Sequence, residues 1–255
     1  MKIHLIYPSW NLTALVEMQP KNIDEKKNIA SQVLIKYTKI EQVGFIYSVD
    51  GINMLEMADG ELCVNAIFSY LCLLNREQGI CKTEIYLVWP NYWITGEKKW
   101  ETNYLINFPT VYRHQVIQFD NHSIVELQWI THLITKMNQK NFKIFMENQL
   151  KTLKWTHRHS VTGINNISHG IDCINITPYI YYSQSDTLIC ETCCASGSIS
   201  VVVSEIVQKN LQKKQDWSIW QVSWKKLEIE AFFLNDEIHW TISNHVLYKW
   251  CWILD

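Results

Sequence analysis

Two short segments, about half the chain apart, each place a cysteine directly before an apolar run that is typical of a helix. In both segments a glutamate precedes the cysteine and small or polar residues follow it. The segments are residues 60–71, around Cys63, and residues 191–203, around Cys194. This echo indicates a duplicated unit with one cysteine at the entrance of a helix in each half.

A cysteine in this position has specific chemistry. The first N–H groups of a helix have no partner within the helix and carry partial positive charge, so they stabilise a thiolate. The same groups can hold a carboxylate. Two such helices that face each other could hold an α-carboxylate and place one sulfur on each side of Cα. One thiolate would then remove the Cα proton while the opposing thiol delivers a proton, which is racemisation by two bases without a cofactor.

Other interpretations of these cysteines stay open. Most buried cysteines are packing residues, and that interpretation applies to Cys63 and Cys194 as well. The spacing Cys190-x-x-Cys193-Cys194 is only a weak indication of a metal site, because no second Cys-x-x-Cys is present and His169 is not at zinc-finger spacing. We therefore expect no metal.

Composition limits the function classes. The 255 residues include 23 basic and 25 acidic side chains, for a net charge of −2, so nothing favours nucleic acid or an anionic membrane as a partner. No apolar run approaches the ~18 residues that a membrane helix needs. The N-terminus does not resemble a signal peptide, so we expect a cytoplasmic protein whose 8 cysteines are reduced. With only 8 glycines and 5 prolines, disorder and flexible linkers are not expected.

The first half of the chain alternates between strand and helix patterns. Short apolar stretches separated by a turn predict strands, whereas apolar positions three or four residues apart predict helices. Asp24 is the expected N-cap of the first helix. The predicted strands are 2–7, 12–16, 44–57 and 84–94, and the predicted helices are 24–39 and 66–74.

The second half begins with residues 123–137, where Ile124, Leu127, Ile130, Ile134 and Met137 recur at helical spacing. The pattern therefore predicts a helix there, followed by a second one. Further predicted elements are a helix at 142–153, strands within 161–176, a helix at 199–207, a hairpin turning at Lys225-Lys226, and a last strand over 248–254. The predicted fold class is α+β.

Five blocks carry a family resemblance that spans almost the whole chain. They are residues 8–13 with Asn11, 41–46 with Glu41 and Gln42, 61–66 with Cys63, 120–122 with Asn121, and 188–198 with Cys194. In these blocks the chain resembles the diaminopimelate epimerase superfamily of cofactor-independent, two-cysteine racemases. Within it, the chain is most similar to the histidine racemases of staphylopine-type opine metallophore synthesis.

The resemblance implies a fold of two pseudo-symmetric halves, each a sheet wrapped around a central helix, with the active site in the cleft between them. The first half would comprise residues 1–115, with the strand 245–255 packed back on it, and the second half residues 116–244. Cys63 and Cys194 would be the acid/base pair; Cys194 rather than Cys193 fits the motif, because Ala195-Ser196-Gly197 follows it. The residues implied to contact substrate are Asn11, Glu41, Gln42, Val64, Asn65, Asn121, Ala195 and Ser196.

Several departures from the family pattern bear on the substrate. Relatives carry glycine after each catalytic cysteine and in the first loop, where this chain has Val64, Ala195 and Trp10. The Glu-Arg-Gly run of diaminopimelate epimerases is replaced by Asp186-Thr187-Leu188, which argues against diaminopimelate.

The sequence thus favours a racemase, independent of pyridoxal phosphate and other cofactors, that converts L-histidine to D-histidine for a metallophore pathway. The alternatives are a racemase of another amino acid and a non-catalytic binding relative with a narrowed pocket. A small-molecule amino acid is the expected partner, and a homodimer stays open.

Overall fold

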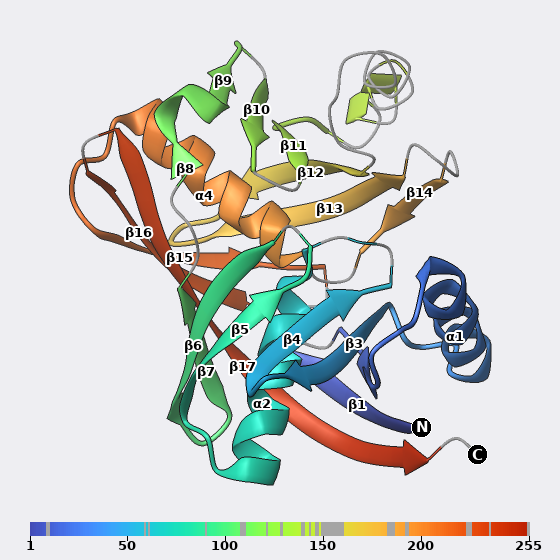
Figure 1. Ribbon diagram of the computed structural model, residues 1–255. Helices are drawn as coiled ribbons and strands as arrows, with labels where there is room; N and C mark the ends of the chain where they lie inside the picture. Colours follow the sequence, from blue (N-terminus) through green and yellow to red (C-terminus); the bar gives the residue numbers. More distant parts are fainter. Residues whose placement is uncertain are drawn as a thin grey trace. The chain divides into compact units, whose positions relative to one another are not determined.

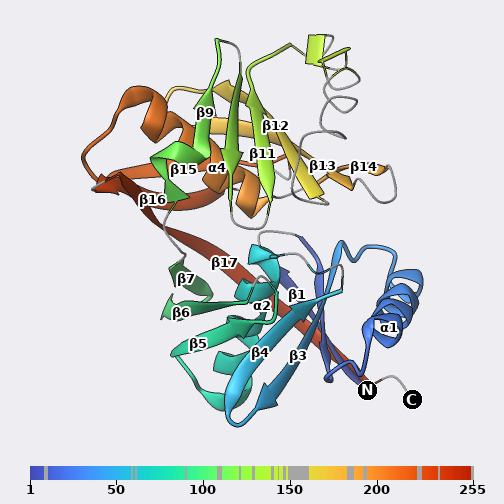
Figure 2. The same cartoon turned by 45° about the horizontal axis from the view of Figure 1, so that its top comes forward.

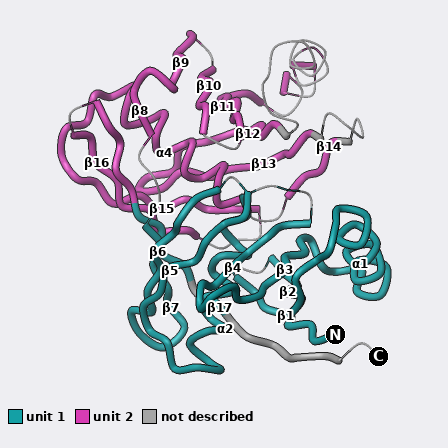
Figure 3. The backbone as a smooth tube through the Cα atoms, in the orientation of Figure 1, with its two compact units in different colours: residues 1–109, 241–255 teal, residues 110–240 magenta. Residues whose placement is uncertain are grey.

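The computed structural model is a sheet-dominated α+β fold with few helices (Figure 1). It divides into two compact units, residues 1–109 with 241–255 and residues 110–240 (Figure 3). The structure describes the chain except for residues 9–10, 59, 61, 90, 108–110, 121, 128–129, 139–140, 143, 146–147, 149–160, 183–186, 192–193, 223–225, 235 and 254–255.

In unit 1 a ring of strands surrounds helix α2 (Val64–Gln78). Each strand is hydrogen-bonded to the next, β7 pairs with the final strand β17, and β17 pairs with β1. All residues of α2 from Val64 to Leu74 are buried, as expected for a helix with apolar surface on every side. The strands are β1 (Lys2–Pro8), β2 (Thr13–Glu17), β3 (Gln42–Val49), β4 (Ile52–Met57), β5 (Lys82–Leu87), β6 (Tyr92–Trp100), β7 (Asn103–Asn107) and β17 (Glu237–Ile253).

In unit 2 the corresponding buried helix is α4 (Ala195–Lys209), which packs against β9, β10, β11, β12 and β16 (Figure 2). A short 3-10 turn, η1 (Arg113–Gln115), precedes β9. The strands are β8 (Val111–Tyr112), β9 (Val116–Gln118), β10 (His122–Glu126), β11 (Thr131–Thr135), β12 (Val161–His169), β13 (Ile174–Tyr182), β14 (Thr187–Cys190), β15 (Gln215–Trp220) and β16 (Lys226–Leu234).

The strands of the two units pair in the same succession. From β1 to β6, the pairings are antiparallel, parallel, antiparallel, parallel and antiparallel. The series β10, β11, β12, β13, β15 and β16 repeats that succession. In both units the buried helix precedes the last two strands of the series, so its first residue lies at an equivalent place in the chain path.

Helix α1 (Ile23–Lys36) covers the outer face of β2 and β3. Its Ala30 and Val33 pack in one apolar cluster with Ala14, Val16 and Phe45. The expected N-cap was wrong by two residues, because Asn22 rather than Asp24 accepts the hydrogen bond from the Glu25 amide, at 2.9 Å. Asn and Asp cap helices about equally well, so the sequence alone could not separate them.

The helix expected at residues 123–137 is wrong. This stretch forms the antiparallel strands β10 and β11, joined by a turn in which the Leu127 amide donates to the Ile130 carbonyl at 3.0 Å. All five residues of β11 are buried, because α4 covers one face and a cluster of Leu133, Phe142 and Ile164 lies on the other. A strand buried on both faces does not alternate between apolar and polar residues. The spacing of its apolar residues can then match that of a helix.

The other sequence-predicted elements have counterparts. Strands occupy the predicted stretches near both ends of the chain and within 161–176, and α2 and α4 contain the predicted helices 66–74 and 199–207. The predicted hairpin corresponds to the antiparallel pair β15–β16, but the turn predicted at Lys225-Lys226 is misplaced, because Lys226 is already paired with Trp220. The predicted helix 142–153 falls largely outside the described residues. Among the helices that the structure describes, none is long and apolar enough to cross a membrane.

Candidate active site

Cys63 is the N-cap residue of α2. Its backbone is extended, and its Sγ accepts a hydrogen bond from the Ala66 amide at 3.3 Å. The side chain is 5% exposed. A sulfur at this place receives the partial positive charge of the helix N-terminus, which favours negative charge on it.

Gln42, the first residue of β3, lies beside Cys63. The Cys63 thiol donates to Gln42 Oε1 at 2.7 Å. Next to it, the buried Asn11 amide donates to the Glu41 carboxylate at 2.9 Å, and Thr13 Oγ1 donates to Asn11 Oδ1. The parallel pairing of β2 with β3 brings these residues together from distant parts of the sequence.

Cys194 is the N-cap residue of α4 and repeats the arrangement of Cys63. Its backbone is extended, its Sγ accepts from the Gly197 amide at 3.4 Å, and its side chain is 4% exposed. A second polar atom, Ser196 Oγ, lies 3.5 Å from the sulfur. Both cysteines that the sequence singled out are thus placed at the entrance of a buried helix.

Gln221, the residue after β15, forms hydrogen bonds with the N-terminal end of α4. Its Oε1 accepts from the Cys194 amide at 3.1 Å, and its Nε2 donates to Ser198 Oγ. Ser198 Oγ in turn donates to the Cys194 carbonyl at 2.8 Å. This ring of hydrogen bonds fixes the backbone of Cys194, and Gln221 is a residue that the sequence reasoning missed.

The Cys194 thiol is held in its neutral form. Burial raises the pKa of Cys194 well above its usual value, and the negative charge of Glu191 raises it further. The hydrogen bonds from Ser196 and the Gly197 amide act in the opposite direction, because they stabilise the thiolate. In the resting protein Cys194 therefore carries a proton that it can donate.

A buried histidine lies behind Ser196. His132, on β11, is inaccessible to solvent, with its Nε2 3.1 Å from Ser196 Oγ and its Nδ1 3.0 Å from the Asn165 amide nitrogen. Burial lowers the pKa of His132 to about 3, so the ring is neutral. Sequence reasoning missed His132 and Asn165, because His132 reaches Ser196 only where α4 packs on β11, and Asn165 reaches His132 only where β12 pairs with β11.

The remaining predicted residues are placed as follows. Val64 and Ala195, the first residues of their helices, are both buried, as is Asn65, whose backbone carbonyl accepts from Ser69 Oγ at 2.8 Å. Asn121, Trp10 and Cys193 lie outside the described residues. His122, next to Asn121, lines a pocket of about 160 Å³ beside the second half of α4.

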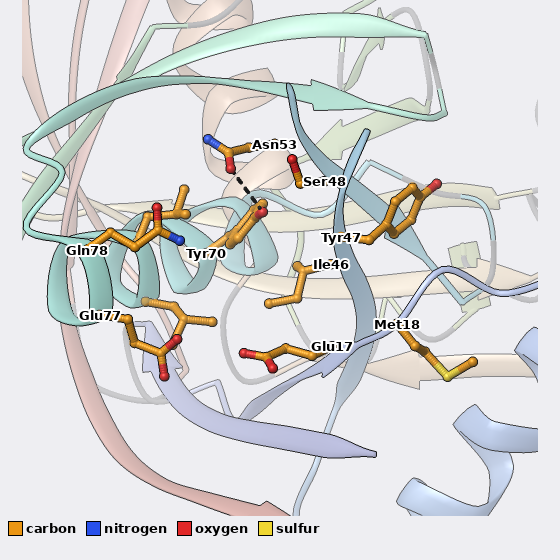
Figure 4. Close-up of a pocket in the computed structure, with 11 residues that line it drawn as sticks. Glu17, Met18, Ile46, Tyr47, Ser48, Asn53, Tyr70, Glu77 and Gln78 are labelled. Carbon is orange, nitrogen blue, oxygen red and sulfur yellow. Dashed lines mark hydrogen bonds between the residues drawn. The ribbon is translucent and has the colours of Figure 1, made fainter. Parts of the chain in front are cut away.

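A larger pocket in unit 1, of about 350 Å³, lies at the far end of α2 from Cys63 (Figure 4). The Tyr70 hydroxyl donates to Asn53 Oδ1 in this pocket, at 3.4 Å. Glu17 and Glu77, which with His4 could hold a metal ion, both pair with the Lys2 ammonium, at 3.2 and 2.8 Å. Because Lys2 pairs with both carboxylates and His4 Nε2 lies 2.7 Å from Glu17 Oε1, these groups already have partners within the chain, and we assign no chemistry to this end of the unit.

Comparison with solved structures defines the class of fold. The chain matches a probable proline racemase from Agrobacterium radiobacter K84 with a TM-score of 0.68 and 8% identity, covering 100% of this chain and 92% of that one. A hydroxyproline epimerase from Agrobacterium vitis matches with a TM-score of 0.68 and 7% identity, over 98% and 90%. A PhzF-family phenazine biosynthesis protein from Bacillus anthracis matches with a TM-score of 0.69 and 11% identity, over 100% and 99%. The fold is therefore the one these racemases, epimerases and PhzF proteins share.

Sequence comparison then gives the family. The family model for the histidine racemase CntK N-terminal domain matches residues 2–239, so the chain belongs to the histidine racemase family. A histidine racemase from Staphylococcus aureus (strain Mu50) is 27% identical over 223 residues, which cover 80% of this chain and 79% of the relative. A second, from Fusobacterium nucleatum subsp. nucleatum, is 25% identical over 217 residues, 77% of each. The protein is an amino-acid racemase, an isomerase.

Proposed function

We propose that this protein interconverts L- and D-histidine by proton exchange at Cα, with Cys63 and Cys194 as the two acid/base groups. The observation that carries the proposal is that two buried helices of equal length, 15 residues, each begin with a cysteine whose sulfur accepts the amide of the third helical residue. The named relatives support histidine as the substrate.

The proposed reaction needs only proton transfers. A thiolate on one side of Cα removes its proton, and the electron pair is delocalised into the carboxylate. The thiol on the other side then protonates Cα, which inverts its configuration and leaves the two sulfurs with exchanged protonation states. Partial positive charge at the two helix N-termini would stabilise the carboxylate as it gains electron density.

The protonation of Cys194 assigns it the acid role in the resting protein. Because burial and Glu191 raise the pKa of this thiol, it enters the reaction as a proton donor. As it donates, Ser196 and the Gly197 amide take over the stabilisation of the new thiolate. Return of a proton from solvent or from the next substrate, in the reverse direction, completes the cycle.

The proposal includes two pseudo-symmetric halves, each of which would contribute one cysteine to the active site. The repeated succession of strand pairings supports this symmetry. Gln42, Asn65, Asn11 and Ser196 would hold the ammonium and carboxylate groups of the substrate. Glu41, whose carboxylate is kept in place by Asn11, would bind the imidazole.

The same proposal extends to the metabolic role and to substrate contacts near the cysteines. Val64 and Ala195 would border the substrate, and Asn121 would contact it from the mid-chain turn. The product, D-histidine, would supply the synthesis of an opine metallophore, as the resemblance to the staphylopine-type racemases implies. No cofactor takes part in this scheme.

A panel of L-amino acids tests the substrate. The purified protein is incubated with each L-amino acid in turn, and the enantiomers are separated by chiral chromatography. We expect D-histidine to accumulate at least ~10-fold faster than any other D-amino acid. A different preferred amino acid would overturn histidine as substrate, and no inversion of any member would indicate a binding protein whose pocket Val64 and Ala195 have narrowed.

A further inference from the structure

The buried ring of His132 fits because the residue opposite it on the neighbouring strand is a glycine. His132 on β11 pairs with Gly163 on β12, and a Cβ at residue 163 would overlap the imidazole ring. Glycine here therefore makes room for a ring that is fully shielded from solvent. A polar ring in such a place must have its nitrogens hydrogen-bonded, and both are.

Those hydrogen bonds determine which nitrogen carries the proton. The Asn165 amide nitrogen, 3.0 Å from Nδ1, can only donate, so Nδ1 is the acceptor. In the neutral ring the proton is then on Nε2, which donates to Ser196 Oγ, 3.1 Å away. Because Ser196 Oγ accepts from His132, its own hydroxyl proton remains to be donated elsewhere.

The sulfur of Cys194 lies 3.5 Å from Ser196 Oγ and can accept this proton. We propose that His132 is a positioning residue that acts through Ser196: it fixes the Ser196 hydroxyl as a donor toward Cys194, and so stabilises the thiolate that forms each time Cys194 gives up its proton. This inference rests on the proposed function, and it assigns a role to a residue that cannot itself touch substrate.

The charges around Cys194 explain why such a donor matters. Glu191 disfavours a thiolate, and burial does so more strongly. The other charged groups along α4 are Glu205 with its partners Lys136, His169 and Lys209, and they lie three helical turns from Cys194. Only the first turn of α4 and Ser196 therefore oppose the effect of Glu191 within the part of the chain that the structure describes.

Unit 1 provides a matched comparison. Its parallel strand pair also has a glycine opposite a buried side chain, but there Gly44 faces Leu15, whose Cδ2 would lie 3.2 Å from a Cβ at residue 44. The apolar Leu15 cannot orient a hydroxyl, and Cys63 instead contacts Gln42 directly. The replacement His132→Leu therefore introduces at unit 2 the residue that unit 1 already accommodates.

Alkylation by iodoacetamide tests the proposal without requiring turnover. The rates at Cys194 and Cys63 are followed between pH 7 and 10 by peptide mass spectrometry in the wild type and in His132→Leu, His132→Gln and Ser196→Ala. We expect His132→Leu to slow Cys194 about tenfold, since a hydrogen bond to a charged group is lost, with Cys63 unchanged. His132→Gln, whose amide can donate to Ser196, should recover the rate to within about threefold.

The double variant of His132→Leu with Ser196→Ala, and the control His169→Gln, complete the test. Ser196→Ala should slow Cys194 as His132→Leu does, and the double variant should add nothing, because both act through one hydrogen bond. His169→Gln, which removes a histidine from the Glu205 cluster, should leave Cys194 unchanged.

An unchanged pH dependence of Cys194 in His132→Leu, with the protein folded by circular dichroism, overturns the proposal. So does an equal loss in His132→Leu and His132→Gln. Because a neutral thiol reacts slowly near pH 7, the test of access is the reaction at pH 10, where the thiolate fraction is highest. A wild-type Cys194 that stays unmodified there, while Cys63 reacts, would show a sulfur closed to small molecules, and the proposed function would fail. Correct alkylation behaviour without any racemisation would reject the function and leave the role of His132 intact.

Discussion

The two cysteine helices, α2 and α4, share their backbone arrangement and differ in what surrounds the sulfur. Each begins with a buried cysteine that caps its own helix, and each ends at a residue in the left-handed conformation, Gly79 or Asn210. Beside Cys63 lies the side-chain amide of Gln42, which accepts the thiol proton. Beside Cys194 lies a hydroxyl supported by His132 and Asn165, with Glu191 nearby.

The comparison shows how one architecture can supply two non-equivalent thiols. The shared features are backbone features, and they provide the same amide donors to both sulfurs. The differences lie in side chains delivered by neighbouring strands, which set how easily each proton leaves. In the proposed reaction one sulfur is a thiolate while the other is a thiol, and the different surroundings would determine which of them carries the proton before substrate binds.

The largest expected effect is loss of activity when either sulfur is replaced. Cys63→Ser and Cys194→Ser should each lower racemisation by about 10³-fold or more, because a serine hydroxyl is a far weaker acid than a thiol. Cys193→Ser and Cys81→Ser are the controls and should retain activity. Racemisation is measured by circular dichroism of the amino acid. Full activity of Cys194→Ser would show that the wrong sulfur has been assigned in unit 2.

The second largest effect is on the stability of the protein in acid. It comes from His132, which has no counterpart at Leu15 in unit 1. The folded-state pKa of His132 is lowered by burial from 6.5 to about 3, so this group stabilises the fold above pH 6.5 and the contribution is lost as the pH falls toward 3. Between pH 7 and pH 5 the wild type should lose about 2 kcal/mol more of its unfolding free energy than His132→Gln.

Urea denaturation at several pH values measures this difference, and His169→Gln is the matched control. The pH 5–7 window lies above the range in which Glu17 and Glu205 bind protons, since the pKa values of both carboxyls are below 4.5. Parallel pH dependence in the wild type and His132→Gln would mean that His132 is not held neutral.

A smaller effect distinguishes the third residues of the two helices. In α2 this residue is Ala66, but in α4 it is Gly197, where a Cβ would lie 2.5 Å from Asn165 Oδ1 and 3.2 Å from Cys194 Sγ. We expect Gly197→Ala to destabilise the protein by about 1–3 kcal/mol through overpacking, as measured by thermal unfolding. Ala66→Gly, the reciprocal change, should cost only about 1 kcal/mol from helix propensity. A Gly197→Ala variant as stable as the wild type would refute the close packing around Cys194.

The smallest effect concerns Gln42. Removing the acceptor of the Cys63 thiol proton in Gln42→Leu should increase the thiolate fraction of Cys63 and speed its alkylation by about 3–10-fold. Cys194, in the other unit, provides the internal control in the same molecules. Equal rates in the wild type and Gln42→Leu would show that this hydrogen bond does not control the thiol.

Features encoded by a few neighbouring residues could be predicted from the sequence, whereas features that depend on contacts between distant segments could not. The start of α2 at Cys63 and of α4 at Cys194 is encoded within a few residues, so both were predictable. His132, Asn165 and Gln221 reach the Cys194 segment through strand pairing and loop placement, for which the sequence has no local signal. The doubly buried strand β11 was mistaken for part of a helix for a related reason, since its burial on both faces is set by distant elements.

The central claim is that two cysteines exchange the Cα proton of histidine, and isotope exchange tests it most directly. The protein is incubated with L-histidine in D₂O, and Cα deuterium and enantiomer composition are measured together by mass spectrometry after chiral separation. We predict D-histidine that is deuterated at Cα with the wild type, and neither D-histidine nor comparable exchange with Cys63→Ser or Cys194→Ser. No Cα deuterium and no D-histidine with the wild-type protein would contradict the claim.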